Sequence, residues 1–226
     1  MASRFGAFGK MPSLGDFFRA DLAQGFVDPW DRWLQEGMLA ARATLGERWQ
    51  DCYFSAPLWR FTLSPGIAGA AGMTGVMMMS VDRVGRQFPL TLASPLPDGA
   101  APLAAHFAGV DALASLEEVA LDALEDGFTR EMLSDRLKTL ALPPAAPHFN
   151  LTEAQGGLVL TEARSQGLAA ELAGRYLERR FRKPSIWSVD LEGTTRLMVC
   201  EGLPAGGQMT GLFDMTAQVW HSMEDA

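Results

Sequence analysis

The sequence predicts an α/β protein of the α+β type, in which helices cover both faces of a mainly antiparallel, meandering sheet. Val76 to Met79 is an unbroken apolar run, as expected of a strand that is covered on both faces. A charged turn with a glycine separates this run from Phe88 to Ala93, which is typical of an antiparallel hairpin. Amphipathic segments before and after the hairpin provide helices for the two faces. We therefore expect an α-β-α sandwich.

Two short elements are expected at the N-terminus. Arg4 to Met11 alternates aromatic and small residues and predicts a strand, in which the glycines indicate a close approach of backbones or a bulge. Pro12 to Asp16 has the composition of a turn. Phe17 to Asp21 then predicts a second short strand or an ordered connection.

The clearest helix of the sequence comes next. Asp28 suits its N-cap, Pro29 its first helical position and Gly46 its stop. Trp30 and Trp33 fall on its apolar stripe, where paired tryptophans are more often part of a core than of a ligand site.

An irregular stretch, a strand and a loop are expected between this helix and the hairpin. Trp49 to Ala56 shows no clear period, whereas Leu58 to Leu63 alternates and predicts a strand. Ser64 to Met73 is rich in glycine and alanine and predicts a loop, without the Gly-Lys-Ser/Thr ending of a phosphate-binding loop. In the hairpin itself, Gly85 can adopt the positive φ that a short turn with a bulge needs.

Two helices and a linker are expected after the hairpin. Ser115 and Glu118 have the spacing of a capping box for the first helix, and Thr129 would cap the second. Leu142 to Pro147 is rich in proline and predicts a stiff, extended linker. It divides an expected single domain of residues 1–226 into a sheet-and-helix core, residues 1–142, and a C-terminal extension, residues 143–226.

The C-terminal extension is expected to hold one helix and one hairpin. Asn150 to Gln155 predicts a loop, and Leu158 to Leu160 a short strand at most. Leu168 to Arg182 predicts a helix whose inward face carries Leu168, Leu172, Tyr176 and Phe181. Ser185 to Leu191 and Thr195 to Cys200 flank a Glu-Gly turn and predict the hairpin.

Composition restricts the classes of function. The chain has 226 residues, 48% of them apolar and 20% charged, enough for one sizeable core. Its formal net charge of -8 argues against a nucleic-acid partner. We find no signal-peptide pattern and no apolar run of membrane-spanning length, so we expect a cytoplasmic protein without membrane insertion. Cys52 and Cys200 stand far apart in apolar contexts and are expected to be buried free thiols.

Two clusters of charged residues are candidate contact sites. The first lies where the central hairpin leaves the core and comprises Asp82, Arg83 and Arg86. It would either cap the sheet edge with internal ion pairs or form a contact surface. The second crowds the end of the last helix and comprises Arg175, Arg179, Arg180, Arg182 and Lys183. These cations would either complement the helix macrodipole or bind an acidic partner.

Sequence motifs do not assemble an active site. The chain contains no G-x-S-x-G, H-E-x-x-H or P-loop motif, and its three histidines stand at no metal-ligand spacing. We therefore expect no enzyme, no cofactor and no small-molecule substrate. One alternative stays open: if the two N-terminal turns meet, Ser13, Asp16 and Asp82 would lie together and could serve a hydrolase.

Five segments occur together and in order, and as a set they strongly resemble the TagF family of type VI secretion-associated proteins. The segments are GKMPSLGDF at Gly9 to Phe17, FVDPWDRWL at Phe26 to Leu34, WRFTLSPG at Trp59 to Gly66, SVDRVGRQFPLTL at Ser80 to Leu92 and CEGLP at Cys200 to Pro204. The order of the first elements also resembles the longin and profilin-like arrangement.

The resemblance to TagF implies a cytoplasmic accessory protein of a contractile secretion machine. It implies post-translational repression of the apparatus, with a forkhead-associated (FHA) scaffold protein as the partner. A structural component of the apparatus is the alternative. Some members carry a serine/threonine phosphatase domain, but this chain is too short for that domain and lacks its aspartate-rich motifs. The resemblance marks Ser13, Asp16, Asp82, Arg83 and Arg86 as architecture or contact positions and not as catalysts.

Overall fold

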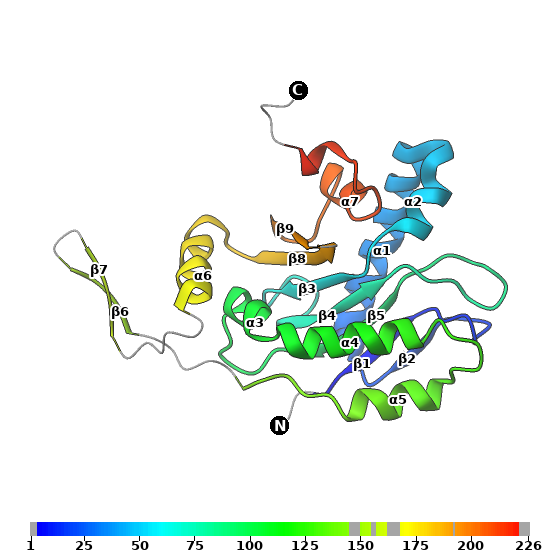
Figure 1. Ribbon diagram of the computed structural model, residues 1–226, viewed down its shortest axis with the longest axis horizontal. Coiled ribbons are helices and arrows are strands. Elements are labelled where there is room, and N and C mark those ends of the chain that lie inside the picture. Colours follow the sequence, from blue (N-terminus) through cyan, green and yellow to red (C-terminus); the bar gives the residue numbers. More distant parts are fainter. Residues whose placement is uncertain (1–3, 145–149, 155–156, 162–167, 192, 222–226) are drawn as a thin grey trace.

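One seven-stranded antiparallel sheet forms the centre of the molecule, in the order β2-β1-β5-β4-β3-β8-β9 (Figure 1). The computed structural model describes residues 4–144, 150–154, 157–161, 168–191 and 193–221. The strands are β1 (Gly6–Gly9), β2 (Phe18–Ala20), β3 (Trp59–Leu63), β4 (Met73–Met78), β5 (Leu90–Pro95), β6 (Asn150–Ala154), β7 (Gly157–Thr161), β8 (Pro184–Leu191) and β9 (Thr194–Glu201). Strands β6 and β7 form a separate two-stranded sheet.

Helices cover both faces of the large sheet, as the sequence predicts. The helices are α1 (Gln24–Leu45), η1 (Gly46–Arg48), α2 (Trp49–Ser55), α3 (Pro102–Ala108), α4 (Val110–Asp122), α5 (Arg130–Lys138), α6 (Leu168–Arg180), α7 (Gly207–Gly211) and η2 (Gln218–Trp220). Figure 1 shows α1, α2 and α7 on one face and α3, α4 and α5 on the other. Every residue of β4 is buried, because both faces of this central strand are covered.

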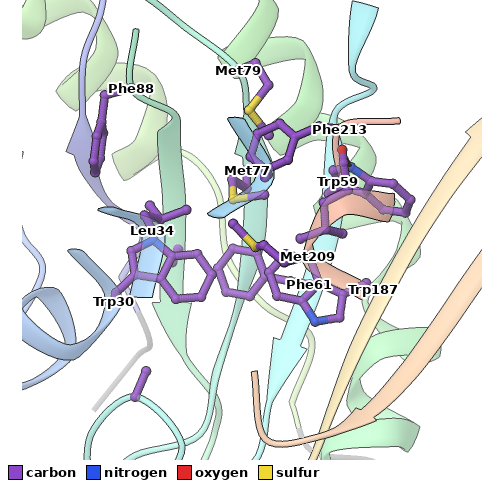
Figure 2. Packing of buried hydrophobic residues seen from close by; sticks show 14 of the residues in the cluster. Trp30, Leu34, Trp59, Phe61, Met77, Met79, Phe88, Trp187, Met209 and Phe213 are labelled. Atoms are coloured by element: carbon purple, nitrogen blue, oxygen red, sulfur yellow. Dashed lines mark hydrogen bonds between the residues drawn. The ribbon is translucent and has the colours of Figure 1, made fainter. Parts of the chain in front are cut away.

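Each face of the sheet has its own apolar core. On the α1 face, Trp30 stacks on Phe61 at 4.7 Å between ring centroids, and both lie close to Trp187 of β8 (Figure 2). On the α4 face, Leu116 and Val119 pack with β4 and β5 side chains. The alternation of β4 sends Val76 to the α4 core and Met77 to the α1 core, as expected of a strand between two layers.

The long helix α1 begins earlier than the sequence predicts. Ala23 takes the N-cap position, so Asp28 lies one turn inside the helix and Pro29 is an interior residue. Phe26 and Val27 are buried and extend the apolar face of the helix. Burying these two side chains contributes about 3–5 kcal/mol, which offsets a cost of about 3 kcal/mol for an interior proline. The prediction of Asp28 as the N-cap is therefore wrong.

The segment after α1 is helical, although the sequence predicted irregular structure. Gly46 ends α1 as predicted, with a positive φ of 55°. The 3-10 turn η1 then leads directly into α2. Trp49, Cys52 and Tyr53 are buried three and four residues apart, which is the spacing of one helix face. The helix is only two turns long, so its period is too short to stand out in the sequence.

Helix α4 also begins before its predicted cap, whereas the cap of α5 is confirmed. Helix α4 starts at Val110, so Ser115 lies in its interior and caps nothing. Leu113 is buried and extends the apolar stripe toward the N-terminus of the helix. In α5, the Thr129 Oγ1 accepts a hydrogen bond from the Met132 N–H at 3.2 Å.

The C-terminal part adds two strands to the large sheet and one separate hairpin. Strand β8 pairs with β3, and β9 pairs with β8 over eight residues, as predicted for the second hairpin. Strands β6 and β7 pair where a loop was predicted over Asn150 to Gln155, and their hairpin projects from the body (Figure 1). Tyr176 of α6 is 70% exposed, so its predicted inward position is wrong. Half of the predicted linker, residues 145–147, lies outside the described residues.

Two further points concern the cysteines and the possibility of a membrane-spanning helix. Cys52 and Cys200 are buried free thiols, as predicted. In the part of the chain that the structure describes, no helix combines the length and apolar character needed to cross a membrane.

Candidate protein-binding site at the paired turns

Two turns meet at one end of the sheet, and we call them the paired turns. They are residues 10–17, between β1 and β2, and residues 79–89, between β4 and β5. Strand β1 pairs with β2 on one side and with β5 on the other, all antiparallel. The end of β1 therefore lies beside the start of β5, and both turns leave the sheet together (Figure 1).

Hydrogen bonds between main chains and side chains lock the two turns to each other. The Arg83 N–H donates to the Leu14 carbonyl at 2.8 Å, and the Arg86 guanidinium donates to the Gly15 carbonyl at 2.6 Å. A Cβ on Gly15 would stand 3.2 Å from the Arg83 guanidinium, so a larger residue there would displace that side chain. The two turns therefore meet, as the hydrolase alternative for Ser13, Asp16 and Asp82 requires.

Asp82 is the centre of the contact between the turns. Its Oδ2 lies 3.0 Å from Lys10 Nζ and accepts from Arg86 Nε at 2.6 Å. Its Oδ1 accepts from the N–H groups of Val84 and Arg86, at 3.1 and 2.9 Å. Burial alone would raise the pKa of Asp82, but these donors outweigh it and hold the pKa far below its usual range. The carboxylate is therefore ionised at neutral pH, and its hydrogen bonds and ion pairs fix the turn.

Several side chains of the paired turns are exposed to solvent. Arg83 is exposed, and its guanidinium makes no hydrogen bond or ion pair with the described residues. Val84 is 69% exposed and Phe17 46% exposed, although both are apolar. Arg86 keeps 55% of its side chain exposed while it binds Asp82. A rigid loop pair thus presents arginine and apolar groups to solvent.

For the cluster of Asp82, Arg83 and Arg86, the sequence left two alternatives, internal ion pairs or a contact surface. Each alternative applies to different residues of the cluster. Asp82 and Arg86 form the internal ion pair of the first alternative, together with Lys10. Arg83 has the free guanidinium that the second alternative, a contact surface, requires. Sequence reasoning missed Phe17 and Val84 as surface groups. Val84 gave a usable signal, because it is an apolar residue inside a short turn that is otherwise charged.

The geometry does not support a hydrolase at the paired turns. The Ser13 hydroxyl is buried and has no hydrogen-bond partner among the described residues, so no base is placed to activate it. Asp16 is exposed and accepts from the Phe17 N–H beside it, at 2.8 Å. The Asp82 carboxylate is occupied by its donors and is too acidic for a general base near neutral pH.

The second charged cluster lies at the opposite end of the molecule, on α6 (Figure 1). Arg179 and Arg180 are exposed at the C-terminus of that helix, and the Arg180 guanidinium stands 5.8 Å from the Phe181 ring centre. The side chain of Arg175 lies outside what the structure describes. The two clusters therefore do not form one surface.

A buried polar network on the α3 face was not predicted. Both ring nitrogens of His106 are within hydrogen-bond distance of hydroxyls, Nδ1 at 2.9 Å from Thr62 Oγ1 and Nε2 at 2.8 Å from Ser188 Oγ. Burial, aided by the Arg60 charge, lowers the pKa of His106 to about 4. The network joins α3 to β3 and β8. No group of three or more His, Cys, Asp or Glu suited to a metal ion occurs among the described residues.

Comparisons with known proteins agree with the sequence motifs. The model of the TagF N-terminal domain, described as type VI secretion system-associated, matches residues 6–140. The crystal structure of PA0076 from Pseudomonas aeruginosa PAO1 is similar, with 32% sequence identity and a TM-score of 0.78, over 95% of this chain and 96% of that one. No curated protein matches the chain. The chain thus belongs to the TagF family of type VI secretion system-associated proteins.

Proposed function

We propose that the chain is a post-translational negative regulator of the type VI secretion system. It acts in the cytoplasm by binding a forkhead-associated scaffold protein of the apparatus through the paired turns. The direction of regulation and the partner are implied by the resemblance to the TagF family. The binding site rests on one observation: the Asp82 network holds two turns rigid and leaves Arg83 without an internal partner.

The composition of the paired turns supports a role in protein binding. Arginine and aromatic residues are enriched at protein–protein interfaces, and the exposed part of the turns offers Arg83 and Phe17. The turns are fixed before a partner arrives, so binding loses little conformational entropy there. Lys10 stands 4.7 Å from the Phe17 ring centre and helps to hold that side chain at the surface.

Pull-down of the scaffold protein from cells with a functional apparatus tests this proposal. We expect Arg83→Glu to weaken capture and to leave the thermal unfolding midpoint unchanged, because the Arg83 guanidinium makes no internal bond. The double variant Arg83→Glu with Arg86→Glu should lose more binding, but it also loosens the turn. Lys138→Glu, at an exposed cation of α5 on the other face of the sheet, is the matched charge-reversal control and should bind normally.

Two results would count against the proposal. If Arg83→Glu captured the scaffold protein normally, the paired turns would not be the binding site. If the unmodified chain did not enrich the scaffold protein, that protein would not be the partner. Stoichiometric recovery of the chain in purified, assembled apparatus would instead favour a structural component, since a regulator should be absent from the finished particle.

A further inference from the structure

A groove of about 320 Å³ lies beside the paired turns, between α1, the start of α2 and the end of the β4–β5 turn. Its floor is aromatic, since Trp49 and Phe88 line it and are almost fully buried. The Trp49 Nε1–H donates to Gln87 Oε1 at 2.8 Å, which ties α2 to the turn and fixes the floor. The hollow is thus preformed and has the size of a small binding pocket.

The rim of the groove is apolar and exposed. Leu39 of α1 lines the groove and is 73% exposed, and Met38 beside it is half-buried. A single exposed leucine needs no explanation on a protein surface. Here it stands next to a concave aromatic floor, so an apolar side chain inserted from outside would contact Leu39, Trp49 and Phe88 together.

The charge of the groove is opposite to that of the chain. Arg42 is the one charged residue among the described groove-lining residues, and no carboxylate lines it, in a chain of net charge -8. Arg42 is exposed and makes no hydrogen bond or ion pair with the described residues. Arg83 and Arg86 precede the lining residue Gln87 by a few positions. An acidic group would therefore find two unpaired guanidinium groups, that of Arg42 at the groove and that of Arg83 at the paired turns, whereas Arg86 is already paired with Asp82.

The groove adjoins the paired turns, because its lining residues Gln87 and Phe88 belong to the second of these turns. The Phe88 ring at the floor meets the Phe17 ring of the turns edge to face, with 4.7 Å between centroids. We infer that this surface binds an acidic, amphipathic segment of the partner protein, whose apolar side chain enters the groove and whose carboxylates meet Arg42 and Arg83. An amphipathic helix in an apolar groove is a common mode of such recognition. The inference rests on the proposed function and names the chemistry of the partner segment.

Affinity for the purified forkhead-associated scaffold protein, measured by titration calorimetry with the full chain, tests the inference. Leu39→Glu and Arg42→Glu should each weaken binding at least about tenfold, because they place a carboxylate against an acidic segment. Arg42→Lys keeps the charge and should change affinity less than about threefold. Leu121→Glu is the matched control on α4, where the leucine is 54% exposed on the other face of the sheet, and it should bind normally.

The outcomes separate the groove from the proposed function. Normal binding by Leu39→Glu and Arg42→Glu would overturn the inference and leave the proposed partner intact. No binding by the unmodified chain would overturn both. Self-association of the unmodified chain that Leu39→Glu abolishes, measured by sedimentation, would make a second copy the occupant and would also overturn the inference. Should Leu39→Glu misfold, Leu39→Ala must still weaken binding several-fold for the inference to stand.

Discussion

Neighbouring residues of the β4–β5 turn have different roles, although the sequence presents them as one charged cluster. Asp82 is buried and collects four donors, whereas Arg83 is exposed and uses only its backbone N–H within the molecule. A buried anion that loses its charge leaves its cationic partners unpaired, and here those partners include the buried Lys10. We therefore expect the stability of the fold to depend on Asp82, and we propose that partner binding depends on Arg83.

Substitutions at these two positions should separate the roles. We expect Asp82→Asn to lower the thermal unfolding midpoint and to broaden amide signals of both turns in NMR spectra. Arg83→Ala should change the free energy of unfolding by less than about 0.5 kcal/mol, as is usual for an exposed side chain. Equal destabilisation by the two substitutions, measured by urea unfolding, would show that Arg83 is also structural.

His106 should make the stability of the fold depend on pH. Its pKa is about 4 in the folded chain, against an ordinary value of 6.5. Between these values the unfolded chain takes up a proton that the folded chain does not, so stability falls as the pH falls. From pH 7.5 to pH 5.0 we expect a loss of about 2 kcal/mol in the free energy of unfolding.

Urea unfolding of the chain and of His106→Gln at the two pH values measures this dependence. The variant should be less stable at pH 7.5 but should lose much less stability on acidification. The pKa values of Asp82 and Asp214 are lowered from an ordinary 3.8, so their contributions are lost only below this window. An equal loss in both proteins would assign the dependence to other groups.

At the scale of elements, the sequence predicted interiors better than boundaries. The central hairpin, β3, the second hairpin and the cap of α5 are confirmed, because each has a strong local period or a distinctive turn residue. The starts of α1 and α4 were misplaced, because Asp28 and Ser115 look like caps locally while tertiary burial of Phe26 and Leu113 extends each helix. Capping residues are local signals, and they contain no information about burial against distant parts of the chain.

The sequence marks most residues of the candidate site but does not show which of them are structural and which are exposed. The motif segments marked Asp16, Asp82 and the arginines, and the structure brings the two turns together. Which side chain is buried depends on the pairing of β1 with β5, a long-range contact that no local pattern reveals. The groove was missed for the same reason, since it joins Leu39 to Phe88 across 49 positions of the sequence.

Pro29 offers a direct test of where α1 begins. Inside a helix, proline removes one backbone hydrogen bond, and alanine at the same position would restore it. Proline also restricts the unfolded chain, which offsets part of that gain. We expect Pro29→Ala to raise the free energy of unfolding, measured in urea, by about 2 kcal/mol. A lower stability would fit the first helical position that the sequence suggested.

At the scale of the whole molecule, we propose that the two predicted parts fold as one cooperative unit. Strand β8 pairs with β3, and Trp187 of β8 packs against Trp30 and Phe61. The Trp59 Nε1–H donates to the Leu212 carbonyl at 2.8 Å, far along the chain. The C-terminal part thus covers the α1 core and the edge of β3.

A chain cut to residues 1–142 should therefore fail to fold. It would expose the edge of β3 and the large aromatic side chains that β8 and α7 cover. We expect aggregation or no cooperative unfolding transition by circular dichroism. In the full chain, tryptophan fluorescence and circular dichroism should report the same midpoint. A sharp transition of the shortened chain would instead make residues 143–226 a separate extension.

The regulatory role is tested most directly by secretion from cells that lack the chain. Secretion by the type VI apparatus would be measured in a deletion strain, with immunoblots confirming that apparatus proteins are unchanged. We expect secretion to rise, to return to its original level with the unmodified chain, and to stay high with Arg83→Glu. Unchanged or lower secretion in the deletion strain would contradict repression, and full restoration by Arg83→Glu would contradict binding through the paired turns.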